Sequence, residues 1–391
     1  MLTALRFGYA YNWFDIGPAL PRIGASFGVG PGLWGVLVAG FLIGAGATQV
    51  PAGWLSRRFG ERPVTLVGAA TLAVAALGGA AAPSYALLLG TRVVAGVGAG
   101  LFFSPAIGWV GRLFGPGERG VPVGVFSSAF SAGGAAGIVG SALLVPVVGW
   151  QGSLAAGAVG LGAMTLLALG AIPRTATPPV ERPSRRPEPS TGVWRSRSVV
   201  AIGLAFVGFE GATFATGQFV VPFGEVVRLW PAWLAGTVGA SFILPSIVGG
   251  PVGGILSERS MRHRAQLAGI TVLGAAALAV LPFAGIAAAL LVGSVFSFAY
   301  GFAYAVMYVL PHYWSDLPER EVPLAIGLFN AIQLGGGALV SAAFGLIVAA
   351  RSYAVGWEFA AAVQVVCLLA LVGLRPTVPA RPAGAAAAAL P

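Results

Sequence analysis

Residues 5–27 read LRFGYAYNWFDIGPALPRIGASF, an apolar stretch with Arg6 and Arg22 near its ends and Asp15 close to its middle. A helix of this length spans a hydrocarbon core of roughly 30 Å. An acid at the centre of such a helix costs roughly 2.5–3.5 kcal/mol on insertion scales, so it persists where it faces protein or an aqueous cavity. The stretch therefore predicts a first transmembrane helix with a functional acid at Asp15. The alternative is an Asp15 that serves helix packing by hydrogen-bonding a neighbour.

The composition of the whole chain is that of an integral membrane protein. Of its 391 residues 57% are hydrophobic and 9% are charged, whereas soluble domains carry about 25% charged residues. The 60 glycines suit close contact between helices in lipid. Since no segment alternates with the period of two that barrel strands need, we expect an all-α membrane protein.

The residue types that the chain lacks exclude several functions. All 22 basic residues are Arg, so a Walker-type phosphate loop, a Schiff-base lysine and a Ser-Lys nucleophile are excluded. The single cysteine, Cys367, and the distant histidines His263 and His312 provide neither a disulfide framework nor a Cys/His metal site. We expect no cofactor, no bound metal and no ATP hydrolysis by this chain alone.

Hydropathy over a window of about 19 residues predicts twelve spans, six on each side of one long polar stretch. They lie near 5–25, 33–55, 64–82, 85–107, 121–145, 153–172, 199–222, 233–256, 265–283, 286–310, 323–348 and 353–374. The polar stretch 173–198 is rich in Pro and Arg and is typical of a flexible linker. The predicted organisation is an N-terminal six-helix bundle (1–172), a cytoplasmic linker (173–198), a C-terminal six-helix bundle (199–378) and a cytoplasmic tail (379–391).

The arginines indicate the orientation in the membrane, because positively charged loops stay in the cytoplasm. With the N-terminus inside, 18 of the 22 arginines, including Arg6, fall on the cytoplasmic side, and Arg22, Arg228 and Arg351 fall outside. The net charge of +10 is then an orientation signal, and nucleic-acid binding is not expected. We expect a multi-pass protein of a prokaryotic inner membrane with both termini cytoplasmic.

Three landmarks recur in the same order in the two halves of the chain. They are Phe14-Asp15 and Phe209-Glu210 at an offset of 195, Gly53–Arg58 and Gly254–Arg259 at 201, and Gly149-Trp150 and Gly356-Trp357 at 207. The order predicts two parallel structural repeats. Transporters with such repeats place the substrate site at the repeat interface near the bilayer midplane.

Residues 53–62, GWLSRRFGER, resemble the signature loop between the second and third helices of the major facilitator superfamily. The conformational loop residues that correspond are Gly53, Arg57, Arg58, Gly60 and Arg62, with Glu258 and Arg259 in the second-half copy at Gly254–Arg264. Arg57 stands where the family usually has Asp, and Glu258 restores an acid in the copy. Arg92 with Gly96 and Gly98 is similar to the family's Arg-x-x-x-Gly-x-Gly pattern.

The resemblance implies twelve helices in two bundles and transport by alternating access. It also implies that the first, fourth, seventh and tenth helices line a central cavity. In the fifth span Gly124, Gly133 and Gly137 keep the glycine spacing of the family's antiporter motif, but Ile138 replaces the proline that should follow. The direction of transport therefore stays open between uptake and efflux.

The candidate proton-coupling or substrate residues are Asp15, Glu210 and Arg92. The two acids occupy mirrored places in the repeats, and a carboxyl that alternates between an open and a closed cavity can load and release a proton. Sodium, or a substrate ammonium group, is the alternative partner of these acids. Arg92 either faces the cavity beside Asp15 or braces the N-terminal bundle against backbone carbonyls.

Further polar and aromatic residues are candidates for the cavity wall. Tyr300, Tyr304 and Tyr308 are spaced by four and share one helix face. The same pattern is also typical of packing, and each polar candidate is equally typical of a hydrogen bond between helices. The complete set is Asn12, Phe206, Gln218, Tyr300, Tyr304, Tyr308, Asn330 and Gln333.

The sequence thus predicts a secondary active transporter that moves a small organic solute, coupled to protons or another cation, as a monomer in the lipid bilayer. With Arg92 as the lone deep cation, a neutral, cationic or singly anionic solute is favoured over a phosphate ester. The alternatives are a multidrug-type proton antiporter and the permease subunit of an ATP-driven complex. An intramembrane enzyme is a further alternative, and it requires Asp15 and Glu210 within a few ångströms of each other.

Overall fold

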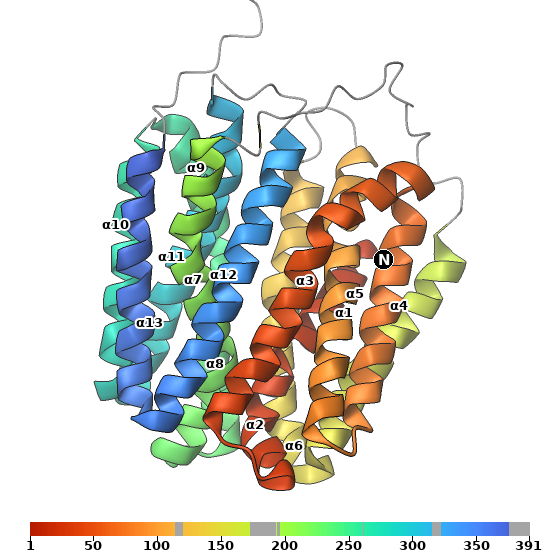
Figure 1. Ribbon diagram of the computed structural model, residues 1–391, viewed down its shortest axis with the longest axis vertical. Coiled ribbons are helices and arrows are strands. Elements are labelled where there is room, and N and C mark those ends of the chain that lie inside the picture. Colours follow the sequence, from red (N-terminus) through yellow and green to blue (C-terminus); the bar gives the residue numbers. More distant parts are fainter. Residues whose placement is uncertain (114–119, 173–192, 194–195, 261, 315–321, 375–391) are drawn as a thin grey trace, which may run out of the picture.

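The chain forms long helices that run side by side in two groups, α1–α6 and α7–α13 (Figure 1). The structure is a computed structural model that describes residues 1–113, 120–172, 193, 196–260, 262–314 and 322–374, and no β-strand occurs among these residues. The α-helices are α1 (Leu2–Phe14), α2 (Ile16–Phe27), α3 (Pro31–Phe59), α4 (Glu61–Ala80), α5 (Tyr85–Arg112), α6 (Gly120–Ala171), α7 (Arg197–Pro222), α8 (Ala232–Ser241), α9 (Ser246–Arg259), α10 (His263–Val280), α11 (Ile286–Val309), α12 (Val322–Ala350) and α13 (Tyr353–Cys367). Short helical turns are η3 (Phe223–Val227), η4 (Leu281–Phe283), η5 (Leu310–Tyr313) and η7 (Leu368–Gly373).

Ten helical segments in the described ranges are long and apolar enough to cross a membrane. One of them, Pro122–Ala171, changes direction at Gly149, whose φ of 75° and ψ of 171° are non-helical. Glycine adopts a positive φ without the steric penalty of a Cβ atom. The first predicted span is present as α1 and α2, which meet at Asp15 and are each too short to count among the ten. The prediction of an all-α multi-pass membrane protein is confirmed.

Glycines bring α1 and α6 into backbone contact. At Gly133 an added Cβ would collide with the carbonyl oxygen of Phe7, and at Gly137 it would lie 2.5 Å from that of Tyr11. Small residues let helices approach closely in lipid, where packing replaces the hydrophobic effect between helices. The glycine spacing of the fifth predicted span therefore serves α1–α6 packing, whereas Gly124 of the same helix has no such neighbour within 4 Å.

We expect Gly137→Ala to destabilise the protein and Gly124→Ala to leave it unchanged or slightly more stable. The backbone that faces Gly137 cannot yield as a side chain would, and overpacking of this kind costs about 1–3 kcal/mol. At Gly124 the methyl group enters open space and removes the helix penalty of glycine, which is about 1 kcal/mol. Thermal unfolding of the two variants in the same detergent checks this, and equal melting temperatures would contradict the contact.

The two helix groups meet along α3 and α12, along α2 and α7, and between α6 and the α8–α9 pair. At Gly35 of α3 an added Cβ would lie 2.7 Å from the carbonyl oxygen of Ser341 in α12. Deeper between the groups, the hydroxyls of Ser131 in α6 and Ser246 in α9 are 2.7 Å apart and share a hydrogen bond. The aromatic and small side chains between the groups therefore form one continuous core.

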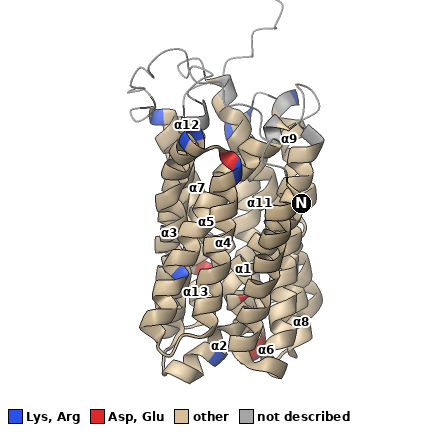
Figure 2. Ribbon diagram, turned by 90° about the vertical axis from the view of Figure 1, so that its right-hand side faces the viewer, with Lys and Arg blue, Asp and Glu red and all other residues tan. Residues whose placement is uncertain are grey.

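Charged segments gather at one end of the molecule, the end at which α9 and α12 are labelled in Figure 2. Arg57, Arg58 and Arg259 are exposed there. Of the predicted linker (173–198), residues 173–192 and 194–195 lie outside the described residues, as does the whole tail (379–391). The domain boundaries therefore stay predictions.

Candidate functional site

Glu210 is a buried acid in the middle of α7 that faces a neighbouring helix. Its side chain is 4% exposed, and its Oε2 accepts a hydrogen bond of 2.9 Å from the hydroxyl of Tyr300 in α11. Gly337 of α12 leaves room for this side chain, since a Cβ there would lie 3.3 Å from Cγ of Glu210. The carboxylate is thus held between α7, α11 and α12.

The predicted tyrosine stripe continues from Glu210 as a polar network. The rings of Tyr300 and Tyr304 are 5.6 Å apart, and the hydroxyls of Tyr304 and Tyr308 share a hydrogen bond of 2.9 Å. Tyr308 donates to Oδ1 of Asn330 at 2.7 Å, and Nε2 of Gln333 donates to the same oxygen at 2.7 Å. Five of the predicted cavity residues therefore lie together, on facing sides of α11 and α12. The three tyrosines are half-buried, which leaves part of each surface accessible.

Asp15, at the junction of α1 and α2, faces the N-terminal group of helices. It is 1% exposed, its Oδ1 has no hydrogen-bond partner, and a Cβ added to Gly157 of α6 would lie 2.8 Å from its Oδ2. Asn12, one turn earlier, donates to the carbonyl oxygens of Gly8 at 2.8 Å and Gly157 at 3.0 Å. The two acids therefore have different surroundings, α6 for Asp15 and α11 for Glu210.

Arg92 of α5 is buried beside the same segment of α1. It is 5% exposed, its Nη1 donates to the carbonyl oxygen of Asn12 at 3.4 Å, and its guanidinium lies 4.4 Å from the ring centre of Phe41. Asp15 is an electrostatic neighbour, but within the described residues no ion pair joins the two side chains. This geometry is the one expected if Arg92 braces α1, while a contact with substrate stays a prediction.

Arg6 is the buried cation whose position the sequence does not reveal. The orientation argument counts it among the cytoplasmic arginines, but its side chain is 7% exposed and lies among the rings of Tyr9, Phe103, Phe126 and Phe130. The start of α1 lies below the upper ends of α3 and α4 (Figure 1), and Leu2 and Leu5 of its first turns are buried. Arg92 is therefore not the lone deep cation. The missed signal is the run of aromatic residues at Tyr9 and Trp13, on the face of α1 that carries Arg6.

Arg6 and Glu210 approach one interior region from the two helix groups. Tyr9 of α1 and Tyr304 of α11 are each electrostatic neighbours of both charged residues. Aromatic contacts bridge the groups nearby, with the Trp13 and Phe214 ring centres 5.2 Å apart. We call the set Arg6, Tyr9, Glu210, Tyr300 and Tyr304 the central site.

Two other predicted cavity residues serve packing in this structure. Nε2 of Gln218 in α7 donates to the carbonyl oxygen of Trp13 at 2.7 Å, which ties the two helix groups together. Phe206 is 3% exposed, and its ring stacks 6.4 Å from that of Phe209. The direct contact of either residue with a solute stays a prediction.

The signature loop is a sharp link between α3 and α4. Gly60 adopts a φ of 88°, and Arg62 in the first turn of α4 donates to the carbonyl oxygens of Leu169 (3.0 Å) and Ile172 (2.9 and 3.2 Å) at the end of α6. A cation at a helix C-terminus is favourable, because it pairs unsatisfied carbonyls and the negative end of the dipole. Arg57 and Arg58 are exposed, and an added Cβ at Gly53 would meet no atom within 4 Å. In the second-half copy Arg259 is exposed, and the side chain of Glu258 lies outside the described structure.

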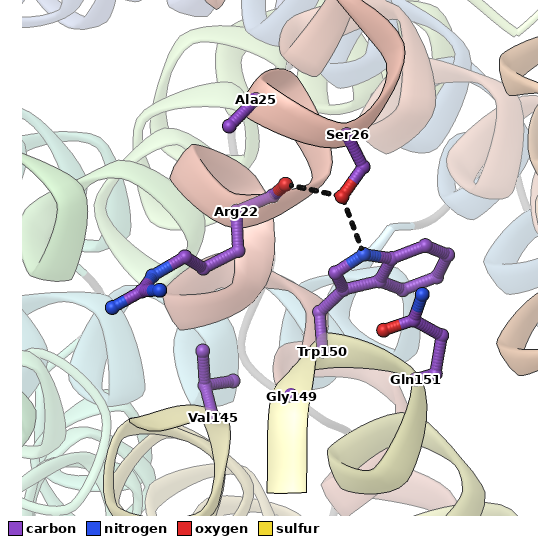
Figure 3. A pocket seen from close by; sticks show the side chains of 7 residues that line it. All are labelled: Arg22, Ala25, Ser26, Val145, Gly149, Trp150 and Gln151. Carbon is purple, nitrogen blue, oxygen red and sulfur yellow. Dashed lines mark hydrogen bonds between the residues drawn. The ribbon is translucent and has the colours of Figure 1, made fainter. Parts of the chain in front are cut away.

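A cavity of about 350 Å³ opens at the other end of the molecule, away from the signature loop (Figure 3). Ser26 of α2 accepts a hydrogen bond of 3.0 Å from Nε1 of Trp150 and donates to the carbonyl oxygen of Arg22 at 2.9 Å. These bonds fix α2 to the bend of α6, so the Gly149-Trp150 landmark has a structural role. The cavity is lined by Arg22, Ala25, Ser26, Val145, Gly149, Trp150 and Gln151, none of which is a predicted site residue.

The two buried acids do not form a catalytic dyad in this structure. A catalytic dyad requires its two carboxyl groups in one pocket, whereas Asp15 and Glu210 face different helices. Within the described part of the chain, His, Cys, Asp and Glu form no group of three or more that could hold a metal ion.

Comparison with known proteins identifies relatives of this chain. The sequence model of the Major Facilitator Superfamily matches residues 2–316. The multidrug transporter AQR1 of Candida glabrata is 30% identical over 193 residues, which are 48% of this chain and 32% of that protein. The probable nitrate/nitrite transporter NarK2 of Mycobacterium tuberculosis is 29% identical over 276 residues, which are 68% of each chain.

The fold also resembles a solved transporter structure. A D-xylose-proton symporter aligns with a TM-score of 0.75 over 96% of each chain, at 16% sequence identity. At this identity the likeness concerns the fold alone. The matched region spans about a third of the length of AQR1.

Proposed function

The chain belongs to the Major Facilitator Superfamily, and on that premise we propose that it is a secondary active transporter that moves a small organic solute by alternating access, coupled to protons. The solute site in this proposal is the central site between the two helix groups. Such sites lie at the interface of two repeats, where rocking of one repeat against the other exposes them to either side.

The observation that carries the proposal is the buried carboxylate of Glu210 in α7, which accepts a hydrogen bond from Tyr300 of α11 in the second helix group. An ionisable group inside a membrane protein is costly and marks ion or substrate pathways. Glu210 is the coupling acid in this proposal, because it interacts electrostatically with Tyr9 and Tyr304 of the central site. Asp15 is a second proton site on the N-terminal side.

The proposal includes twelve membrane crossings related by a parallel two-fold repeat. Counting α1 with α2 as one crossing and dividing α6 at Gly149 adds two to the ten candidate spans. Both termini and the signature loop are then cytoplasmic, in agreement with the clustering of arginines at that end. The membrane is the inner membrane of a prokaryote, and the functional unit is a monomer.

A multidrug-type proton antiporter is the second candidate function, and the similarity to the multidrug transporter AQR1 favours it. The two candidates use the same central site and the same acid, and they differ in the direction of solute movement relative to the proton. The permease subunit of an ATP-driven complex differs from both candidates because its transport requires ATP.

The test uses purified protein in proteoliposomes without ATP, with a pH difference of two units across the membrane. The probes are D-xylose and nitrate, the solutes named for two of the similar proteins, and ethidium as a cationic drug that tests the multidrug alternative. We expect net movement of at least one probe against its gradient, abolished by a protonophore and absent from protein-free vesicles. Movement that proceeds unchanged with the protonophore would contradict proton coupling.

A further inference from the structure

Arg6 carries a buried positive charge that forms no ion pair with another described residue. The side chain is 7% exposed, and its Nε and Nη1 are buried without a hydrogen-bond partner. A guanidinium in the interior is expensive unless it is paired and hydrogen-bonded. Such a group indicates that something outside the chain completes it.

The aromatic rings around Arg6 stabilise its charge but leave its N–H groups unused. The guanidinium carbon lies 4.4 to 5.5 Å from the ring centres of Tyr9, Phe103, Phe126 and Phe130. Cation–π contacts of this kind stabilise the charge through the electron-rich ring face. Ring faces accept no strong hydrogen bond, and the Tyr9 hydroxyl can pair only part of the guanidinium, so Nε and Nη1 of Arg6 stay available to a further acceptor.

A second donor without a partner lies beside this aromatic box. Nε1 of Trp13 is buried with no acceptor, and its ring lies 5.4 Å from that of Tyr9 and 5.9 Å from that of Phe130. Both rings belong to the box around Arg6. The Tyr9 hydroxyl lies beside both side chains as an acceptor, but a single hydroxyl oxygen cannot pair the N–H groups of both Arg6 and Trp13.

We propose that Arg6 binds the negatively charged group of the transported solute, which is a small organic carboxylate with one negative charge. This rests on the proposed function, since it names the solute class of the central site. Guanidinium matches planar oxyanions in shape and donates charge-assisted hydrogen bonds to them.

The other charged residues near the central site limit the solute to one negative charge. Arg6 offsets one charge, and the carboxylate of Glu210 acts electrostatically on the same two tyrosines, Tyr9 and Tyr304. A second negative charge on the solute would face this carboxylate without a cation of its own. Arg92 does not supply one, because it is held against the α1 carbonyl of Asn12.

Calorimetry tests the proposal by measuring the binding of benzoate, lactate and nitrate to the purified protein. The ionic strength is held constant with chloride. We expect at least one anion to bind and its neutral counterpart, benzamide or lactamide, to bind at least tenfold more weakly. Binding of benzoate or lactate would identify a carboxylate solute, and binding of nitrate alone would identify an inorganic anion. Arg6→Gln is expected to weaken anion binding at least tenfold, and Arg6→Lys to restore part of it.

The matched control is Arg351→Gln, which removes one exposed Arg from the turn after α12 and should leave anion binding unchanged. Thermal unfolding of the unliganded Arg6→Gln protein shows whether it is folded, and its melting temperature should not fall below that of the wild type. Equal binding of benzoate and benzamide, or full anion binding by folded Arg6→Gln, would overturn the proposal. Anion binding without proton-driven transport would contradict the proposed function and leave the anion site in place. Proton-driven movement of ethidium or D-xylose without anion binding would contradict only the role of Arg6 in binding the solute.

Discussion

Glu210→Gln should abolish solute accumulation driven by a pH gradient while solute exchange between the two sides continues. Glutamine keeps the shape of the side chain and an oxygen that accepts the hydrogen bond from Tyr300, but it cannot take up or release a proton. A gradient of two pH units supports up to about a hundredfold accumulation with one proton per solute, since each unit is worth about 1.36 kcal/mol. We expect the ratio across the membrane to fall to about one in the variant.

The control for this experiment is Asp15→Asn, which makes the same chemical change in the other buried acid. Asp15 faces Gly157 of α6 and not the central site, so accumulation by this variant should fall less than in Glu210→Gln. The measurement is uptake and counterflow of one labelled solute by equal amounts of each reconstituted protein. Loss of accumulation in Asp15→Asn with full accumulation in Glu210→Gln would move the coupling site to Asp15.

A disulfide between α3 and α12 should arrest transport reversibly. A Cβ built at Gly32 lies 3.7 Å from Cβ of Ala349, and this separation matches a disulfide. The two residues belong to different helix groups, at the end where α3 begins and α12 ends. If the groups must separate there in each cycle, oxidation of Gly32→Cys/Ala349→Cys should lower the transport rate at least tenfold, and dithiothreitol should restore it.

The background for this test carries Cys367→Ser, because Cys367 is the one natural thiol of the chain. The matched control pair is Ala73→Cys/Gly162→Cys, whose Cβ atoms are 4.0 Å apart between α4 and α6 of the same group. This second disulfide should form without arresting transport. Full transport by the oxidised α3–α12 protein, with cross-linking verified by gel mobility, would contradict separation of the groups at that end.

The sequence by itself determined the class of fold and the position of several elements of the site. Low charge, abundant glycine and long apolar runs leave helices as the way to satisfy the backbone in lipid, so the all-α membrane fold follows from composition. The stripe at Tyr300, Tyr304 and Tyr308 was visible because residues four apart share a helix face. Glu210 stood out because an acid within an apolar run is costly.

Only the tertiary structure decided which neighbour each of these side chains has. Asp15 and Glu210 are equivalent in the sequence repeat, yet one faces a glycine of α6 and the other a tyrosine of α11. In the sequence Arg6 stands at the cytoplasmic end of the first predicted span, because hydropathy measures composition along the chain and not depth within a bundle. Its aromatic box comes from three helices, α1, α5 and α6, and it forms because α1 packs against segments that lie more than 90 residues further along the chain. Local patterns fix which face of a helix is polar, but contacts between distant helices select the partner that this face meets.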